Sequence, residues 1–127
     1  MDEDWCVELV NATIRTAYEQ GNVVIVGRGG QVILGAMPNV LHVRIEAPAE
    51  QRIARIRQEQ SLTESEARKF INDRDNASAT YLRRFFKTRW DDPFLYHMVL
   101  NTGKWETEMA AQVIATALEQ LQQVPAA

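Results

Sequence analysis

Val23-Val24-Ile25-Val26-Gly27-Arg28-Gly29-Gly30 is the stretch that decides the fold of this 127-residue chain. Its first half is a short apolar run, which is typical of a strand buried on both faces of a parallel sheet. Its second half is a glycine turn, where open α/β sheets bind ligands and backbone N–H groups can approach a phosphate. Arg28 adds a permanently charged fork suited to phosphate or carboxylate. The turn is compatible both with an anion site and with a structural turn that carries a surface arginine.

Two common nucleotide-binding fingerprints are not found in the sequence. The dinucleotide fingerprint Gly-x-Gly-x-x-Gly needs a third glycine where this chain has Val32. A P-loop needs Gly-x-x-x-x-Gly-Lys-Ser/Thr, but Gly103-Lys104 is followed by Trp105 and has Met98 where the first glycine belongs. The glycine turn is therefore neither of these two phosphate-binding loops.

Composition places the chain among ordinary globular proteins of one domain, with 46% hydrophobic and 24% charged residues. No run approaches the roughly 18 apolar residues of a membrane span, and the acidic start is unlike a signal peptide. We therefore expect a cytoplasmic protein without a membrane partner. The lone Cys6 and two histidines give no internal disulfide and no zinc spacing, so we expect no metal site.

Charge is unevenly distributed along the chain, whose net charge is −3. This net charge argues against general nucleic-acid binding. Residues 50–90 nevertheless hold ten of the fourteen Lys and Arg residues and only six of the seventeen acids. This middle third either faces an anionic ligand or forms a solvated helical surface.

Hydrophobic periodicity predicts the element order α-β-β-α-α-β-α. Such an order indicates one α/β domain over residues 1–127, with a mostly parallel sheet between helical layers in a three-layer α/β/α arrangement. The predicted helices are 4–20, 48–60, 63–85 and 107–122, and the predicted strands are 22–26, 40–46 and 96–100.

The long helix that opens at the capping box of residues 63–66 carries two basic sites. Arg74 and the pair Arg83-Arg84 lie on roughly opposed faces if this helix is continuous. The helical pattern weakens near residues 76–80, and a break there would fold both sites over one ligand. The alternative is a charged helix exterior stabilised by weak pairs such as Glu66 with Arg68 or Lys69.

Two other polar groups have plain structural interpretations. Asp91-Asp92 could bind Mg²⁺, but its position before Pro93 favours a turn and cap. His42 and His97 lie in strand patterns without a nucleophile motif such as Gly-x-Ser-x-Gly, so we assign neither to catalysis.

Eight motifs, none of them specific alone, follow one another in the order and spacing of a known family. They are VIVGRGG (24–30), PNVLHV (38–43), APxExRIxRI (47–56), TExEA (63–67), DRD (73–75), YLRRFF (81–86), WDDP (90–93) and YxxVLNT (96–102). In this set the chain resembles the cytidylate kinase-like family of nucleoside monophosphate kinases, over about residues 5–120.

The resemblance implies a P-loop kinase fold in which phosphate passes from ATP, with Mg²⁺, to a nucleoside monophosphate. It implies that Arg28 holds the acceptor phosphate and that residues 60–90 form a mobile lid, in which Arg74 closes over the phosphates. It places Asn101 and Thr102 in the loop near the adenine. The residues it marks for nucleotide or phosphate binding are Gly27, Arg28, Gly29, Gly30, Arg74, Asp75, Arg83, Arg84, Asn101 and Thr102.

The chain departs from the family pattern in two places. Family members begin with a strand and a P-loop, which this sequence does not contain, and Ser78 stands where the lid usually has arginine. We therefore expect a kinase-like domain that is inactive or incomplete by itself, and whether the chain is an enzyme stays open. The alternative is a non-catalytic module that binds a nucleotide or another phosphorylated small molecule for regulation or assembly.

The missing P-loop strand also bears on the sheet, because in the family it lies between the strands that match 23–26 and 40–46. Two unpaired strand edges would remain without it. The flanking strands could pair directly, or a strand could come from another subunit or from a longer gene product. We expect a homo-oligomer or part of a longer chain.

Overall fold

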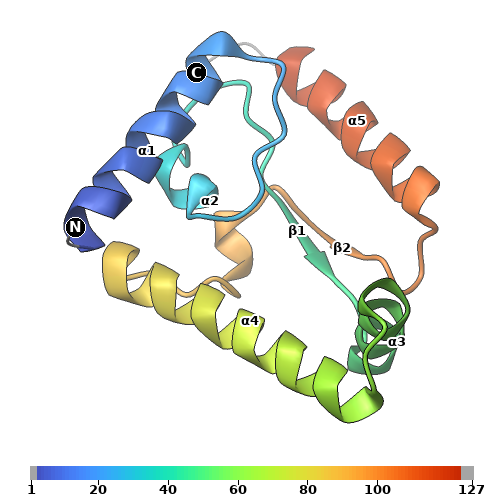
Figure 1. Cartoon of the computed structure of the whole chain (residues 1–127). Coiled ribbons are helices and arrows are strands. Elements are labelled where there is room, and N and C mark those ends of the chain that lie inside the picture. The colour runs from blue at the N-terminus through green and yellow to red at the C-terminus, as the bar shows by residue number, and fades with distance from the viewer. Residues whose placement is uncertain (1–2, 124–127) are drawn as a thin grey trace.

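Helices form most of the molecule and lie around a small sheet in the computed structural model (Figure 1), which describes residues 3–123. The element order is α1 (Glu3–Gln20), α2 (Gly30–Ile33), β1 (Val43–Glu46), α3 (Ala49–Gln60), α4 (Glu64–Phe86), the 3₁₀ helix η1 (Pro93–Leu95), β2 (Met98–Asn101) and α5 (Thr107–Gln123). No helix in this described range is long and apolar enough to cross a membrane.

The sheet consists of β1 and β2, which pair in parallel with Val43 opposite Met98 and Glu46 opposite Asn101. Backbone hydrogen bonds extend the pairing at both ends, from His97 N to the His42 carbonyl (2.8 Å) and from Thr102 N to the Glu46 carbonyl (2.8 Å). The expected α/β class with a parallel sheet is confirmed. Both strands are shorter than their apolar patterns, which span residues 40–46 and 96–100.

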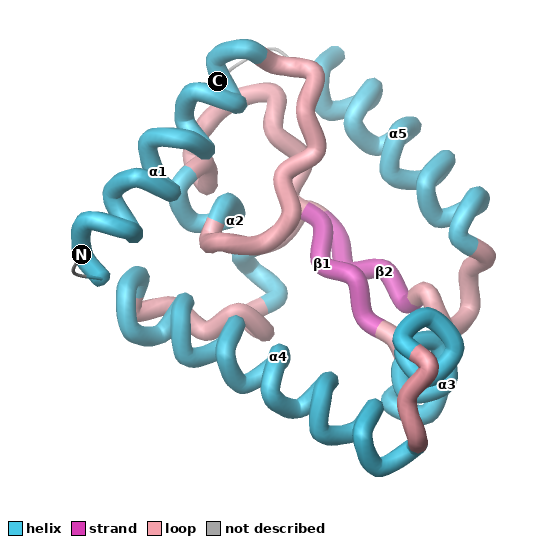
Figure 2. Tube along the Cα trace, viewed as in Figure 1, coloured by secondary structure: helices cyan, strands magenta, loops and turns pink. Residues whose placement is uncertain are grey.

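Residues 22–26 do not form the predicted strand. They run as a loop from α1 toward α2 (Figure 2), and the side chains of Val24 and Val26 are 88% and 86% exposed. Strand propensity describes a fit to a pleated, half-buried surface, and it needs a neighbouring strand to supply hydrogen bonds. No described segment pairs with residues 22–26, so the prediction of a strand buried on both faces is wrong in this structure.

α4 is one continuous helix of 23 residues, so the break considered near residues 76–80 does not occur. The alanines at 77 and 79 are good helix formers, which carry the helix through this polar stretch. At its start Thr63 Oγ1 accepts from Glu66 N (3.2 Å), and Thr63 N donates to Glu66 Oε1 (3.0 Å). The latter bond lowers the pKa of Glu66. At its end Lys87 adopts a left-handed conformation with φ 54°.

Buried apolar side chains are distributed in small groups rather than in one core. One cluster joins α3 to α4 through Ile53, Ala67 and Ile71. α5 turns a half-buried apolar face that includes Val113 and Ile114 toward the rest of the molecule, with Ala110 buried. The total accessible surface of 9514 Å² compares with roughly 6900 Å² for a compact monomer of this mass. The fold is therefore an open frame of helices.

Two charged contacts join α3 to α4. Arg52 donates two hydrogen bonds to the Asp75 carboxylate, at 2.8 and 2.9 Å, and these bonds raise the pKa of Arg52. Arg68 of α4 reaches Glu50 of α3 (2.9 Å) and Glu64 one turn earlier in its own helix (2.8 Å). Glu66 faces back to Thr63 instead, so the pairing expected between Glu66 and Arg68 is wrong.

Thr63→Ala removes the capping side chain and leaves a first-turn N–H of α4 without its partner. We expect the free energy of unfolding to fall by about 1 kcal/mol, measured by urea denaturation. The control is Ser65→Ala in the same exposed first turn, which removes no cap and should change stability by less than about 0.5 kcal/mol. Equal losses in both variants would contradict the role of Thr63 as the cap.

Candidate functional site

The glycine turn that precedes α2 is held in an unusual backbone conformation. Gly27, Arg28 and Gly29 have φ values of 74°, 60° and 81°, so three consecutive residues lie in the left-handed region. Glycine adopts this region freely, whereas arginine does so at a cost of about 1 kcal/mol or more. The turn is closed by a hydrogen bond from Gly30 N to the Gly27 carbonyl (3.3 Å). It leaves Arg28 exposed at its apex.

The glycine turn packs directly against the end of α4. A Cβ atom added to Gly29 would lie 2.6 Å from Cε2 of Phe86, so only glycine fits against this ring. Arg83 and Arg84 lie in the last turn of α4, within one turn of Phe86. The structure thus brings two of the predicted phosphate-binding segments together, although they are more than fifty residues apart in sequence.

The three arginines at this junction differ in whether they already form an ion pair. Arg84 is paired with Glu3 at the start of α1, and both side chains are mostly exposed. The guanidinium groups of Arg28 and Arg83 have no hydrogen-bond or ion-pair partner among the described residues. An exposed guanidinium without a carboxylate partner keeps its donors available for a phosphate or carboxylate ligand.

An open, mainly apolar hollow adjoins Arg28 between α1 and the loop before the turn. Its volume is about 330 Å³. It is lined by Leu9, Val10, Thr13, Ile14, Ile25, Val26 and Arg28. One charged group on the rim of an apolar surface suits a ligand with one anionic and one apolar end.

Arg74 and Asp75 lie farther along α4 from the glycine turn. Asp75 is occupied by its bidentate pair with Arg52, and the Arg74 guanidinium lies over the Phe70 ring at 4.8 Å. Twelve residues separate Arg74 from Phe86, which in a straight helix is about 18 Å. Because α4 is continuous, its middle and its end cannot both fold over one point. The predicted phosphate roles of Arg74 and Asp75 stay predictions.

Asn101 ends β2 and Thr102 begins the turn that follows it, at the carboxyl end of the sheet. Asn101 Oδ1 accepts from Gly103 N (2.9 Å), while the backbone N–H of Thr102 donates to the Glu46 carbonyl (2.8 Å). A Cβ atom on Gly103 would lie 2.5 Å from Cδ of Pro48, so the turn fits closely against the start of α3. Both residues shape the loop, and their contact with a nucleotide stays a prediction.

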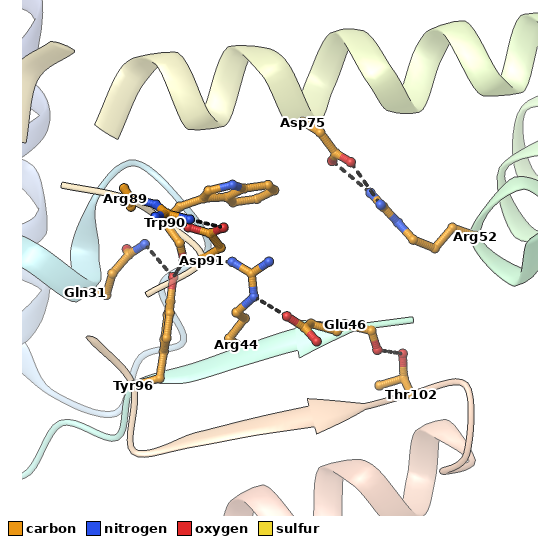
Figure 3. Close-up of polar contacts among 10 residues, drawn as sticks. All are labelled: Gln31, Arg44, Glu46, Arg52, Asp75, Arg89, Trp90, Asp91, Tyr96 and Thr102. Atoms are coloured by element: carbon orange, nitrogen blue, oxygen red, sulfur yellow. Dashed lines mark hydrogen bonds and ion pairs between the residues drawn. The ribbon is translucent and has the colours of Figure 1, made fainter. Parts of the chain in front are cut away.

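A polar network that sequence reasoning missed connects α2, β1 and the loop before β2 (Figure 3). Arg44 donates to Glu46 (2.7 Å) and to the Trp90 carbonyl (2.7 Å), and its guanidinium lies 4.7 Å from the centre of the Trp90 ring. Tyr96 Oη donates to the same carbonyl (2.6 Å) and accepts from Gln31 (3.2 Å). The sequence feature that could have revealed this network is Arg44, a charged residue that interrupts an apolar strand pattern. This network holds the loop that follows α4 against the sheet.

The acidic residues before Pro93 act as the turn and cap that the sequence favoured. Asp92 Oδ1 accepts from Phe94 N (2.9 Å) at the start of η1, and Asp91 pairs with Arg89 (3.0 Å). Among residues 3–123, no group of three or more His, Cys, Asp or Glu side chains could hold a metal ion. The printed sequence also holds no P-loop motif of the kind that binds the phosphates of ATP.

A family model described as the cytidylate kinase-like family matches residues 2–104. The chain belongs to the cytidylate kinase-like family. Its resemblance in eight short motifs is thereby confirmed over most of its length.

Related proteins show how much of such a protein this chain covers. It is 28% identical over 106 residues to a cytidylate kinase of Methanocaldococcus jannaschii, and 26% identical over 115 residues to one of Methanopyrus kandleri. These matches span 81% and 84% of this chain but only 59% and 60% of the relatives. The chain therefore spans about three fifths of the length of these relatives.

A solved structure shares the fold. The crystal structure of an uncharacterized protein from Eubacterium ventriosum superposes with a TM-score of 0.79 at 21% identity. The match covers 87% of this chain and 63% of the other. The arrangement of helices around the small parallel sheet is thus found in an experimental structure as well.

Gly29→Ala and Gly27→Ala separate the contact with Phe86 from the cost of a left-handed backbone. Both glycines have positive φ, so each variant should lose about 1–2 kcal/mol of stability from backbone strain. Only Gly29 faces Phe86, whereas a Cβ atom on Gly27 meets nothing within 4 Å. Gly29→Ala should therefore lose about 1–3 kcal/mol more in chemical denaturation. Equal losses would mean that the turn does not pack on α4 as described.

Proposed function

We propose that this chain forms the acceptor-nucleotide part of a nucleoside monophosphate kinase, in which Arg28 binds the phosphate of a nucleoside monophosphate such as CMP. The observation that supports this most directly is the glycine turn itself. It presents an exposed arginine with no described carboxylate partner, beside an apolar hollow. Membership of the cytidylate kinase-like family supports a nucleotide as the ligand.

Phosphoryl transfer depends mainly on positioning and on neutralising charge, and it needs little covalent chemistry from the protein. The turn fixes the backbone of Arg28, so its fork can hold the acceptor phosphate with two parallel hydrogen bonds. Arg83, in the adjoining end of α4, is placed to add a second positive charge. The apolar hollow offers a surface for the less polar parts of the nucleotide.

The lid is part of the same proposal. Residues 60–90 contain α4, which α3 holds through Arg52 and Asp75 and the glycine turn holds through Phe86. Because the end of α4 already packs on the turn, Arg74 would come nearer to a bound phosphate only if the whole helix pivoted about that contact. Closure would exclude water and so favour transfer over hydrolysis.

The donor side of the reaction needs residues that the printed sequence does not contain. ATP with Mg²⁺ would supply the transferred phosphate, and a P-loop would have to bind it. We propose that this loop and its strand come from a longer chain or from another subunit, and that the strand completes a three-layer sheet. The exposed Val24 and Val26 and the large accessible surface support a missing neighbour. A cytoplasmic location belongs to the same proposal.

A non-catalytic role is the second candidate. Ser78 stands where lids of this family usually carry arginine, and the residues present offer no donor-phosphate cradle. A protein that binds a nucleotide without transferring its phosphate would use the same Arg28 turn for regulation or assembly. The two candidates differ in whether ATP is consumed once a donor loop is supplied.

Arg28→Ala is expected to weaken the binding of CMP between about tenfold and a hundredfold, because it removes charged hydrogen bonds to the phosphate. Isothermal titration calorimetry on the whole chain measures this change. Cytidine, which has no phosphate, should bind equally to both proteins. Arg55→Ala is the matched control, since Arg55 is an exposed arginine of α3 without a described partner. Unchanged CMP affinity in Arg28→Ala would overturn the acceptor-site assignment.

Sedimentation velocity over a range of concentrations tests the origin of the missing neighbour. If a second copy supplies it, the 14.5 kDa chain should shift to a dimer or larger species as its concentration rises. A monomer at every concentration would contradict the homo-oligomer and leave a longer chain as the source.

A further inference from the structure

The two histidines of the chain lie together at the entrance to the sheet. His42 precedes β1 and is 7% exposed, and His97 precedes β2. Their rings are stacked, with centroids 5.5 Å apart and planes inclined by 8°. The fold of the two parallel strands therefore brings together residues that are 55 positions apart.

Hydrogen bonds identify the protonation state of this pair. His42 Nε2 lies 3.1 Å from the Leu34 carbonyl, which can only accept, so Nε2 carries a hydrogen. The backbone N–H of His42 donates to His97 Nδ1 at 2.9 Å, so this nitrogen carries none. These bonds assign the proton of His97 to Nε2 as well. The arrangement requires a neutral His97 and is fully satisfied by a neutral His42.

A second proton acts differently on the two rings. His97 can take it only at Nδ1, which removes the acceptor of the His42 N–H and sets two N–H groups against each other. On His42 it leaves the bond to the Leu34 carbonyl in place, and the ring becomes a buried cation stacked on the other imidazole. Burial lowers the pKa of His42, the bond to the Leu34 carbonyl opposes this shift, and the neighbouring His97 adds to it.

The surroundings of the buried His42 offer little to stabilise an added positive charge, whereas His97 is exposed. Residues 29–37, which carry Leu34, contain no ionisable side chain. On β1 the nearest charged side chain in sequence is Arg44, itself a cation, and before β2 Tyr96 donates to the Trp90 carbonyl. From α1, Tyr18 reaches the Pro38 carbonyl. No described Asp or Glu forms an ion pair with either imidazole.

We propose that His42 and His97 form a pH-operated link between the segments that precede β1 and β2, closed when both imidazoles are neutral and opened by protonation. Leu34 follows α2, which begins directly after the glycine turn, so its carbonyl bond to His42 places that turn beside the link. The inference goes beyond the proposed function and does not require that a nucleotide binds.

The amino-acid composition of the chain allows the effect of protonating the two histidines to be separated from the titration of other side chains. The only imidazoles are those of His42 and His97, while carboxylates ordinarily titrate near pH 4 and the thiol near pH 8.5, about 1.5 pH units outside the window from 5.5 to 7. In that window the unfolded chain binds more protons than the fold, because the pKa of His42 is lowered in the folded state. Stability is therefore complete above about pH 7 and falls as the pH drops toward the folded-state pKa.

Amide hydrogen exchange of His42, followed by NMR at pH 7 and pH 5.5, tests the link directly. After correction for intrinsic exchange, the open population in the natural chain should rise by up to about tenfold per pH unit for each proton taken up. His97→Asn keeps an acceptor oxygen where Nδ1 lies but does not titrate, so its pH dependence should be weaker. His97→Ala has no acceptor and should leave the His42 amide open at both pH values.

The variant His42→Gln with His97→Asn removes both titrating groups and should abolish the pH dependence of exchange and of the melting temperature between pH 5.5 and 7. The chemical shift of the His42 imidazole provides an independent readout, because its pKa should rise once His97, which lowers it, is replaced. The same open population in the natural chain at both pH values would overturn the proposal. So would a pH dependence that persists in the double variant, since neither result depends on ligand binding.

Discussion

The parallel pairing of β1 with β2, four residues each, is the constraint on which the arrangement of the helices depends. In α/β proteins helices bury their apolar faces against the strands between them, and a narrow sheet offers little such area. α3 and α4 consequently bury Ile53, Ala67 and Ile71 against one another. The apolar face of α5 stays half-buried, and the molecule remains an open frame.

Contacts at the ends of elements hold this frame together. Gly29 against Phe86 fixes the glycine turn on α4, and Arg52 with Asp75 fixes α4 on α3. Arg44 with Trp90 fixes the loop that follows α4 on the sheet. Half-exposed ion pairs contribute little to stability, so only a few contacts hold α4 in place. Such a small number of contacts is compatible with the proposed movement of residues 60–90 as a lid.

Local features of this fold could be predicted from the sequence because they depend on neighbouring residues. The capping box at Thr63 and the cap at Asp92 are set within one turn of chain. Helices α1, α3 and α5 follow the apolar periodicity closely. The prediction for residues 22–26 failed because a strand depends on a distant partner, and no described segment supplies one.

The candidate site shows the same division. Arg28 was identifiable from the glycines around it, but its proximity to the end of α4 was not. Asp75 was grouped with the phosphate ligands, yet the packing of α3 on α4 gives its carboxylate to Arg52. The Arg44 network joins three segments that share no sequence motif. The only sign of it in the sequence was that Arg44 interrupts an apolar strand.

The sequence by itself determined the family, most helices, their caps and the glycine turn, since periodicity, capping chemistry and backbone freedom act over a few residues. Only the tertiary structure decided which arginines keep free donors, which strands exist and where the two histidines meet. These outcomes depend on pairing between segments far apart in the chain. The apolar run 23–26 illustrates this division, because its residue types favour a strand but its partner must come from elsewhere.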